Sequence, residues 1–499
     1  MTIKRWLLIL VAVLAIVWAV VRAWVQSITL DEADTYFWFA SRAARYIWYP
    51  FPNNHTLNTL LIWITTHLFG TSSLTVRAPA LLGAVLYVFT CYFLCRSITN
   101  HFSIQFPLLI CLIYNPFIFD FMAAARGYSL ANAFLLASIA IPVWRHVKGS
   151  PSLSRCCALA SLALGLSFTA NFSFAFVDLA AFLVIAAWAI RRRETESVVR
   201  IAGWCVLPGL IVVLLLCGYP LAHWPKGELW YGAHSLTEMT QNLIQSSLYR
   251  LNRHFLGTGL EAATNLATPW LPPLLLILCL CQLVATRIDG SWIQDARARW
   301  VGRFGIMVAA VLALSVLISL LAFRFDKLPL PMGRTGIYLI TFSTLVAGVV
   351  AAAPARSLVS KWLGRAVTAV FICMACYFLL CLRVRYFKEY EWDADVKDVY
   401  FVLAGLNKKY GATDVAVDGI YLSSLNFYRV VSKKESFPEF QYVPPHRFPS
   451  GKSIYVLHDP FDRDVIEREG LAVIYRGQST EVVVAVKPGG RIPAIMIER

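Results

Sequence analysis

Three carboxylates within four positions stand out in "TLDEADTYFWF", residues 29–39, directly after a long apolar stretch. Thr29 and Glu32 have the spacing of a capping box, so one interpretation is a helix N-terminus that needs acids only as caps. A helix starting there places Asp31 and Asp34 on one face and points Glu32 elsewhere. A cap does not require Asp31, so a functional carboxylate is the other interpretation, and both stay open.

The chemistry available to Asp31 is of two kinds. A carboxylate can take a proton from an acceptor hydroxyl, and the low polarity near a membrane favours that role. Neighbouring carboxylates can instead hold a divalent cation. The spacing does not choose between a base and a metal ligand.

A second polar stretch, "FPNNHTLNTLL" at 51–61, precedes a short apolar run. For Asn53 and Asn54 an ordinary loop is the favoured interpretation, whereas His55 is a candidate contact to a substrate. The apolar run within 57–70 is about a dozen residues, which is too short to span a bilayer. We therefore expect a juxtamembrane helix lying in the interface.

The segment "AAARGYSLANAF", at 123–134, places Arg126 between two apolar spans. An arginine at such depth costs a few kcal/mol unless it is paired or reaches the interface. One interpretation is an interfacial arginine with Tyr128 as an aromatic anchor. The functional interpretation is a phosphate ligand, because a guanidinium group binds phosphate oxygens bidentately.

Basic residues recur in "FRFDKLPLPMGRTGIYL", at 323–339, before the last two predicted spans. The positive-inside bias makes lysine and arginine unexpected on the outer side of a membrane, where this segment is predicted. An anionic lipid head-group would explain them. The candidates for such contacts are Arg324, Lys327, Arg334 and, at the start of the second span, Arg77.

Composition defines the class of protein that carries these residues. The chain is 58% hydrophobic and 15% charged, whereas soluble domains carry about 25% charged residues, so we expect an integral membrane protein. The net charge of +16 sits mainly in short tracts between apolar runs, which is typical of topology-setting loops. A nucleic-acid partner is therefore not expected.

Eleven spans are predicted because a bilayer core about 30 Å thick needs roughly 20 apolar residues per helix. Lysine and arginine clusters in alternate loops place the N-terminus in the cytoplasm. An odd number of spans then places the chain after residue 385 outside it, with a bacterial inner (plasma) membrane as the expected location. The predicted spans are 6–25, 74–96, 104–121, 127–144, 155–171, 173–190, 201–221, 269–286, 303–323, 335–353 and 364–382.

Two domains are expected: a transmembrane domain at 1–385 and a small extracytoplasmic α/β domain at 386–499. In the second, "TDVAVDG", "SIYVLHD", "LAVIYRG" and "TEVVVAV" have the length of strands, and 395–410 has a helical pattern. Within the first, the outer loops 26–73 and 222–268 are long enough to be more than connectors.

Other chemistries find little support in the sequence. Nothing matches GxxxxGK[ST], no GxGxxG opens a helix after a strand, and no HExxH occurs. A soluble nucleotide-sugar site has no visible place, which favours a donor carried in the membrane.

The order of these motifs resembles the GT-C superfamily of membrane glycosyltransferases, in the branch of the protein O-mannosyltransferases and the lipid A aminoarabinose transferase. The resemblance covers roughly 1–355 and includes "DE", "NNHTL", "FGTSSLTVRAP", "ARGYSL" and "GRTGIYL". It implies a GT-C-like polytopic helical fold with juxtamembrane helices, a polyprenyl-phosphate-linked sugar as donor, and transfer on the outer face.

By position, the resemblance makes Asp31 the base or acceptor-binding carboxylate and Glu32 its catalytic neighbour. Arg126 and Arg334 fall where basic residues meet the lipid phosphate. The chain departs from the family in having "HTLN" where Pro-Pro often follows the histidine, and it lacks the inserted domain typical of protein mannosylation. The acceptor therefore stays open between a lipid, a glycan and a protein. No cofactor is expected with certainty, and a divalent metal ion is the candidate.

The alternative is a transporter or flippase that moves an anionic polyprenyl lipid and uses the same arginines as head-group contacts. Transporters often show internal repeats and broken spans at matching places in two halves. Neither is visible in the sequence, so the prediction is a glycosyltransferase.

Overall fold

The fold is described from a computed structural model of the chain. The described residues are 3–149, 151–193, 196–225, 227–248, 258–293, 296–432, 437–443, 452–489 and 492.

Within the described residues, ten helical segments are long and apolar enough to cross a membrane. The protein is therefore a polytopic helical membrane protein, as its composition predicted. The helices are α1 (Ile3–Val25), α4 (Ser73–Ile98), α7 (Tyr128–Lys148), α8 (Leu153–Ala170), α9 (Ala175–Arg192), α10 (Val198–Ala222), α13 (Leu271–Ile288), α14 (Ala296–Phe325), α15 (Ile337–Ala351) and α16 (Leu358–Leu380).

The prediction of one continuous helix at 104–121 is wrong, because the structure divides this segment into two helices. Helix α5 (Phe102–Ile113) has 12 residues, and α6 (Pro116–Phe121) begins after a break. The twelve residues of α5 alone reach about 18 Å, short of a bilayer core of about 30 Å, so a crossing at this place needs α5 and α6 together. The break has a local cause: Asn115 caps α6 by accepting hydrogen bonds from two backbone N–H groups, and the proline that follows it disfavours helical backbone.

Shorter helices fill the segments between the spans. The predicted juxtamembrane helix at 57–70 is present as α3 (Thr56–Phe69). Helix α2 (Leu30–Thr35) starts where the capping-box spacing predicted it. The long loop 222–268 contains α11 (Leu236–Ser247) and α12 (Thr258–Ala267).

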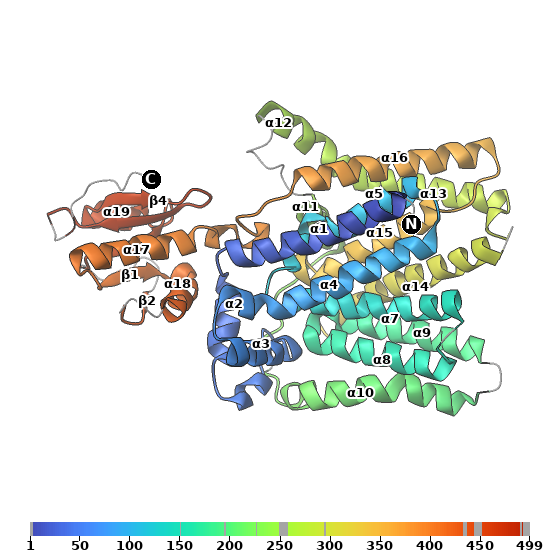
Figure 1. Cartoon of the computed structure of the whole chain (residues 1–499), viewed down its shortest axis with the longest axis horizontal. Helices are drawn as coiled ribbons and strands as arrows, with labels where there is room; N and C mark the ends of the chain where they lie inside the picture. The colour runs from blue at the N-terminus through green and yellow to red at the C-terminus, as the bar shows by residue number, and fades with distance from the viewer. Residues whose placement is uncertain are drawn as a thin grey trace. The chain divides into compact units, whose positions relative to one another are not determined.

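Helices α7, α8 and α10 run side by side (Figure 1). Small residues allow the close approach of α8 and α10. A Cβ atom on Gly165 would lie 2.6 Å from the carbonyl oxygen of Gly209, and one on Gly209 would lie 2.4 Å from that of Ser161. Such contacts suit a lipid environment, where association depends on packing rather than on the hydrophobic effect.

The C-terminal segment forms a five-stranded mixed sheet in the order β2-β1-β3-β5-β4. Strand β1 is parallel to β2 and β3, and β5 is antiparallel to β3 and β4. The four predicted strands and the predicted helix are all confirmed. The elements are α17 (Val396–Tyr410), β1 (Val415–Asp418), α18 (Gly419–Val431), β2 (Tyr442–Val443), β3 (Ile454–His458), α19 (Arg463–Glu469), β4 (Ala472–Arg476) and β5 (Val482–Val486).

The chain divides into two compact units, each described by itself. The bundle unit comprises Met1–Val20, Trp48–Asn58 and Pro79–Arg383. The sheet unit comprises Val21–Ile47, Thr59–Ala78 and Val384–Arg499, so the three acids of the opening motif belong to the same unit as the C-terminal sheet.

Candidate functional site

The capping box predicted for Thr29 and Glu32 is confirmed. The Thr29 Oγ1 accepts a hydrogen bond from the Glu32 backbone N–H at 3.3 Å, and the Glu32 Oε2 accepts one from the Thr29 N–H at 2.9 Å. Glu32 is fully buried, so its carboxylate also needs a compensating charge.

Arg77 supplies that charge from helix α4. Its Nε donates to Glu32 Oε1 at 2.9 Å and its Nη2 to Oε2 at 2.6 Å, with both side chains at 0% exposure. The remaining N–H groups of Arg77 donate to three carbonyl oxygens at the end of α1, those of Ala23, Gln26 and Ser27. All five N–H donors of the guanidinium group are thus engaged.

This bonding gives Glu32 and Arg77 a structural task, which is to fix the end of α1 to the start of α2. The sequence had made Glu32 a catalytic neighbour of Asp31 and Arg77 a phosphate contact. Those roles stay predictions, and the geometry favours the structural task for both.

Asp31 and Asp34 have hydrogen-bond partners different from those of Glu32. The Tyr390 hydroxyl donates to Asp31 Oδ2 at 2.7 Å, and the Ser423 hydroxyl donates to Asp34 Oδ1 at 2.6 Å. Both acids are half-buried. Their partners come from the C-terminal segment, and no sequence pattern indicated them.

Asp393 is a fourth acid beside this group that sequence reasoning missed. It is 1% exposed and accepts hydrogen bonds from the Leu30 N–H at 2.9 Å and from the Ser424 hydroxyl at 3.1 Å. Burial raises the pKa of Asp393 well above its ordinary value; the two hydrogen bonds oppose the shift, and the charges of Asp31 and Glu32 add to it. The only hint in the sequence was the acid-rich run "EYEWDAD".

Asp393→Asn is expected to make folding of the sheet unit less dependent on pH. Because the folded pKa is raised, the contribution of Asp393 to stability is fully present at low pH and is lost as pH rises from about 4 toward the folded pKa. An amide replaces the neutral carboxyl group and cannot ionise. The variant should therefore lose less stability than the wild type as the pH rises, and it should be the more stable of the two proteins at the alkaline end of the range.

Thermal unfolding in detergent from pH 5 to pH 8 measures this effect. Asp414→Asn is the control, because Asp414 accepts a hydrogen bond from the Ser453 N–H elsewhere in the same unit. A variant of Asp393 that keeps the wild-type pH slope contradicts the assignment of a buried neutral carboxyl group.

The second candidate group lies in the bundle unit around Arg126. This residue is 1% exposed, and its Nη2 donates a hydrogen bond to the Asn53 Oδ1. The ring of His55 packs edge-on against that of Tyr128, with centroids 5.8 Å apart. Asn171 links Arg126 to His55. Its Nδ2 donates a hydrogen bond to the Arg126 carbonyl oxygen at 3.1 Å and lies 3.4 Å from His55 Nε2.

The backbone turn after Arg126 depends on Gly127, which has φ +74° and adjoins the carbonyl of Ala170 so closely that a Cβ atom would lie 2.1 Å from its oxygen. The turn therefore joins Arg126 to Tyr128, whose ring contacts that of His55; their roles as substrate contacts stay predictions. Sequence reasoning had dismissed Asn53 as a loop residue and missed Asn171, whose signal was an amide at the end of an apolar span.

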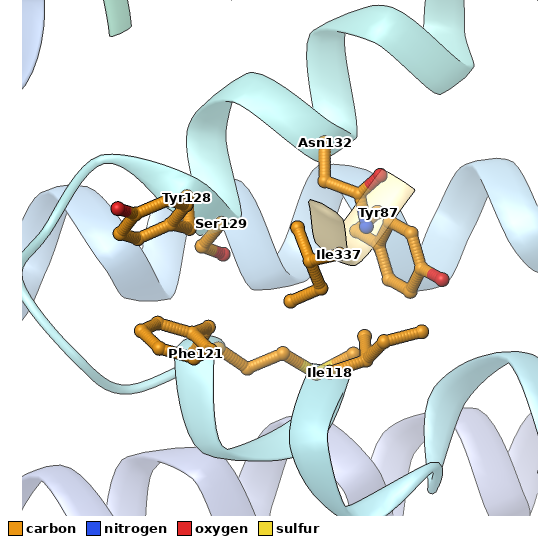
Figure 2. Close-up of a pocket in the computed structure, with 8 residues that line it drawn as sticks. Tyr87, Ile118, Phe121, Tyr128, Ser129, Asn132 and Ile337 are labelled. Carbon is orange, nitrogen blue, oxygen red and sulfur yellow. The ribbon is translucent and has the colours of Figure 1, made fainter. Parts of the chain in front are cut away.

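A small cavity opens beside Tyr128, and Figure 2 shows the Tyr87 and Asn132 side chains at the same pocket. Its volume is about 10 Å³, which is room for about one water molecule, so it is too small for a sugar phosphate. The Asn132 Nδ2 donates to Thr341 Oγ1 at 3.1 Å. The cavity is lined by Tyr87, Ile118, Phe121, Met122, Tyr128, Ser129, Asn132 and Ile337.

The basic residues near the end of α14 lie in different settings. Arg324 and Lys327 are exposed. Lys327 has φ +56°, and the Leu328 N–H donates to the Ala322 carbonyl at 3.3 Å, which is the pattern of a helix C-terminal cap. Arg334 is half-buried, with its guanidinium carbon 5.1 Å from the centroid of the Tyr231 ring.

The ten predicted site residues thus fall into the two units. Those in the sheet unit are Asp31, Glu32, Asp34 and Arg77, and those in the bundle unit are His55, Arg126, Tyr128, Arg324, Lys327 and Arg334. In the part of the chain that the structure describes, no group of three or more His, Cys, Asp or Glu is placed to hold a metal ion.

The sequence and the fold were each compared with those of known proteins. No family model and no curated protein matches the sequence. In structure, the chain shares its polytopic helical fold with a protein of known structure over almost its whole length.

The particular structure that carries this comparison is a crystal structure of ArnT from Cupriavidus metallidurans bound to undecaprenyl phosphate. It superposes with a TM-score of 0.52 at 12% identity, over 98% of this chain and 99% of that one. The apo form of the same ArnT gives 0.45 at 12% identity, over 97% and 98% of the two chains. Arabinofuranosyltransferase AftD from Mycobacteria gives 0.47 at 13% identity, over 98% of this chain and 40% of its own.

Proposed function

We propose that the protein is a glycosyltransferase that moves a sugar from a polyprenyl-phosphate donor to an acceptor hydroxyl. The observation that carries the proposal is its fold, shared over almost the whole chain with a protein crystallised with undecaprenyl phosphate. The acid motif and the buried arginine turn are the two groups of residues that such a reaction needs.

In this proposal Asp31 takes the proton from the acceptor hydroxyl. The acceptor oxygen then forms a bond to the anomeric carbon of the sugar, and the bond from that carbon to the phosphate oxygen breaks. The electron pair of the broken bond stays on the polyprenyl phosphate, where Arg126 and Arg334 offset the charge. His55 and Tyr128 contact the donor beside Arg126.

Asp31 suits the base better than its neighbours do. Its side chain is half-buried, whereas Glu32 is fully buried and bonded to Arg77. Asp34, which is half-buried like Asp31, is assigned to substrate binding. Arg324 and Lys327 are exposed, and we assign them to contacts with the phosphate head-group of the lipid.

The proposed location is a bacterial inner membrane, with the N-terminus in the cytoplasm and transfer on the outer face. The distribution of lysine and arginine between the loops supports this orientation. The acceptor belongs to the compounds of the cell envelope: a lipid, a glycan or a protein.

Incubation of the purified protein in detergent with labelled polyprenyl-phosphate sugars and extracts of envelope acceptors tests the proposal. We expect free polyprenyl phosphate to be released in step with sugar transfer, because the reaction breaks the bond between them. Heat-denatured protein serves as the control.

The alternative function is a flippase of an anionic polyprenyl lipid, for which the buried Arg126 would be a head-group contact. That protein would bind the labelled lipid without releasing polyprenyl phosphate. In vesicles it would change the leaflet in which the lipid is found, and a glycosyltransferase would not.

A further inference from the structure

The segment that carries Asp31, residues 27–34, forms several hydrogen bonds with the C-terminal part of the sheet unit. Five residues of the segment 27–34 form hydrogen bonds to that part: Ser27, Ile28, Leu30, Asp31 and Asp34. The Ile28 N–H donates to the Tyr428 hydroxyl at 2.8 Å, and the Leu30 N–H to Asp393. The Ser27 hydroxyl donates to the Ala394 carbonyl at 2.7 Å.

Within this set of contacts, one side chain reaches the proposed base itself. The Tyr390 hydroxyl donates to Asp31 Oδ2 at 2.7 Å, the length of a strong hydrogen bond to a carboxylate. The tyrosine is 3% exposed, and its ring lies edge-on to those of Phe387 and Trp392, with centroids 6.5 and 5.9 Å away. Aromatic packing on two sides holds the hydroxyl in place.

Such a donor does two things to a carboxylate. It stabilises the charged form, which is the form that accepts a proton, and it restricts the rotation of the carboxyl group. A tyrosine keeps its own proton at neutral pH, so the hydrogen bond persists over the range in which enzymes work.

We propose that Tyr390 is a positioning residue for Asp31, and that the C-terminal segment of the sheet unit serves to orient the acid. This proposal rests on the function proposed above for Asp31. The neighbouring contacts of Asp393, Ser423 and Tyr428 hold the same segment and belong to the same device.

Tyr390→Phe tests the proposal, because it removes the hydroxyl and leaves the ring. We expect kcat/KM for sugar transfer to fall about tenfold, the loss typical of one hydrogen bond to a charged group. The acidic limb of the pH profile should move to higher pH by about half a unit or more, since the charged form of the carboxylate loses a donor.

Tyr421→Phe is the matched control. The Tyr421 hydroxyl is hydrogen-bonded to His458 Nδ1 at 2.6 Å in the same unit, so the substitution removes a comparable bond that does not reach Asp31. Its pH profile should follow that of the wild type. A Tyr390→Phe enzyme with a wild-type rate and pH profile overturns the proposal, and so does an equal shift in both variants.

A spectroscopic titration separates this proposal from the proposed function. The infrared carboxylate band of Asp31, isolated by subtracting the spectrum of Asp31→Asn, can be titrated in protein that turns over no donor. We expect its midpoint to move to higher pH in Tyr390→Phe and to stay unchanged in Tyr421→Phe. An unmoved midpoint in Tyr390→Phe counts against the positioning role whether or not the protein transfers sugar.

Discussion

Asp31→Asn is expected to lower the rate of sugar transfer by about a thousandfold while the protein still folds and inserts. Removal of a general base typically costs 10²–10⁴-fold in rate. Asparagine has nearly the shape of aspartate, and its carbonyl oxygen can still accept the hydrogen bond from Tyr390. The effect should therefore appear in kcat rather than in yield or thermal stability.

Single-turnover release of polyprenyl phosphate from a labelled donor measures this loss without contribution from product release. Asp418→Asn is a suitable control: Asp418 caps α18 by accepting a hydrogen bond from the Ile420 N–H, and an asparagine keeps that cap. The control should retain wild-type activity. If Asp31→Asn transferred sugar at the wild-type rate, Asp31 would not be the base.

Arg77→Met is expected to destabilise the protein by about 3–5 kcal/mol, the usual cost of removing one partner from a buried ion pair. The substitution leaves the buried Glu32 carboxylate without its opposite charge. It also removes the donors for the carbonyl groups of Ala23, Gln26 and Ser27. Both losses occur away from water, where unsatisfied polar groups cost most.

The midpoint of thermal unfolding in detergent, together with the yield of folded protein, measures this cost. Arg468→Met is the control, because Arg468 forms an ion pair with Asp464 at 3.8 Å while 47% exposed; its loss should cost about 1 kcal/mol or less. The double variant Glu32→Met/Arg77→Met should regain part of the lost stability, since it leaves no buried charge. Equal stability of Arg77→Met and wild type would contradict the structural role assigned to Arg77.

Local patterns in the sequence determined the individual elements. The spacing of Thr29 and Glu32 located the start of α2, and apolar runs of strand length located β1, β3, β4 and β5. These features depend on residues a few positions apart, so no knowledge of the fold was needed. The break between α5 and α6 was also local, marked by the Asn115 cap and the proline after it, although hydropathy alone concealed it.

The candidate site was determined by sequence only in part. The acid motif and the turn after Arg126 were both visible, because carboxylates and arginines are unusual beside apolar spans. Which residues bond to them was not visible. Asn171 reaches the Arg126 carbonyl from 45 positions away, and it looked like the end of an ordinary span.

Only the tertiary structure distinguished Glu32, which forms a buried ion pair, from Asp31, which is the candidate base. Glu32 meets Arg77 from 45 positions away, and Asp31 meets Tyr390 from 359 positions away. Such pairs form because packing of the sheet unit brings distant segments together and excludes water from around their charges. Type and spacing name the groups that can do chemistry, but burial and the partner across the contact decide whether a carboxylate is a structural ion or a candidate base.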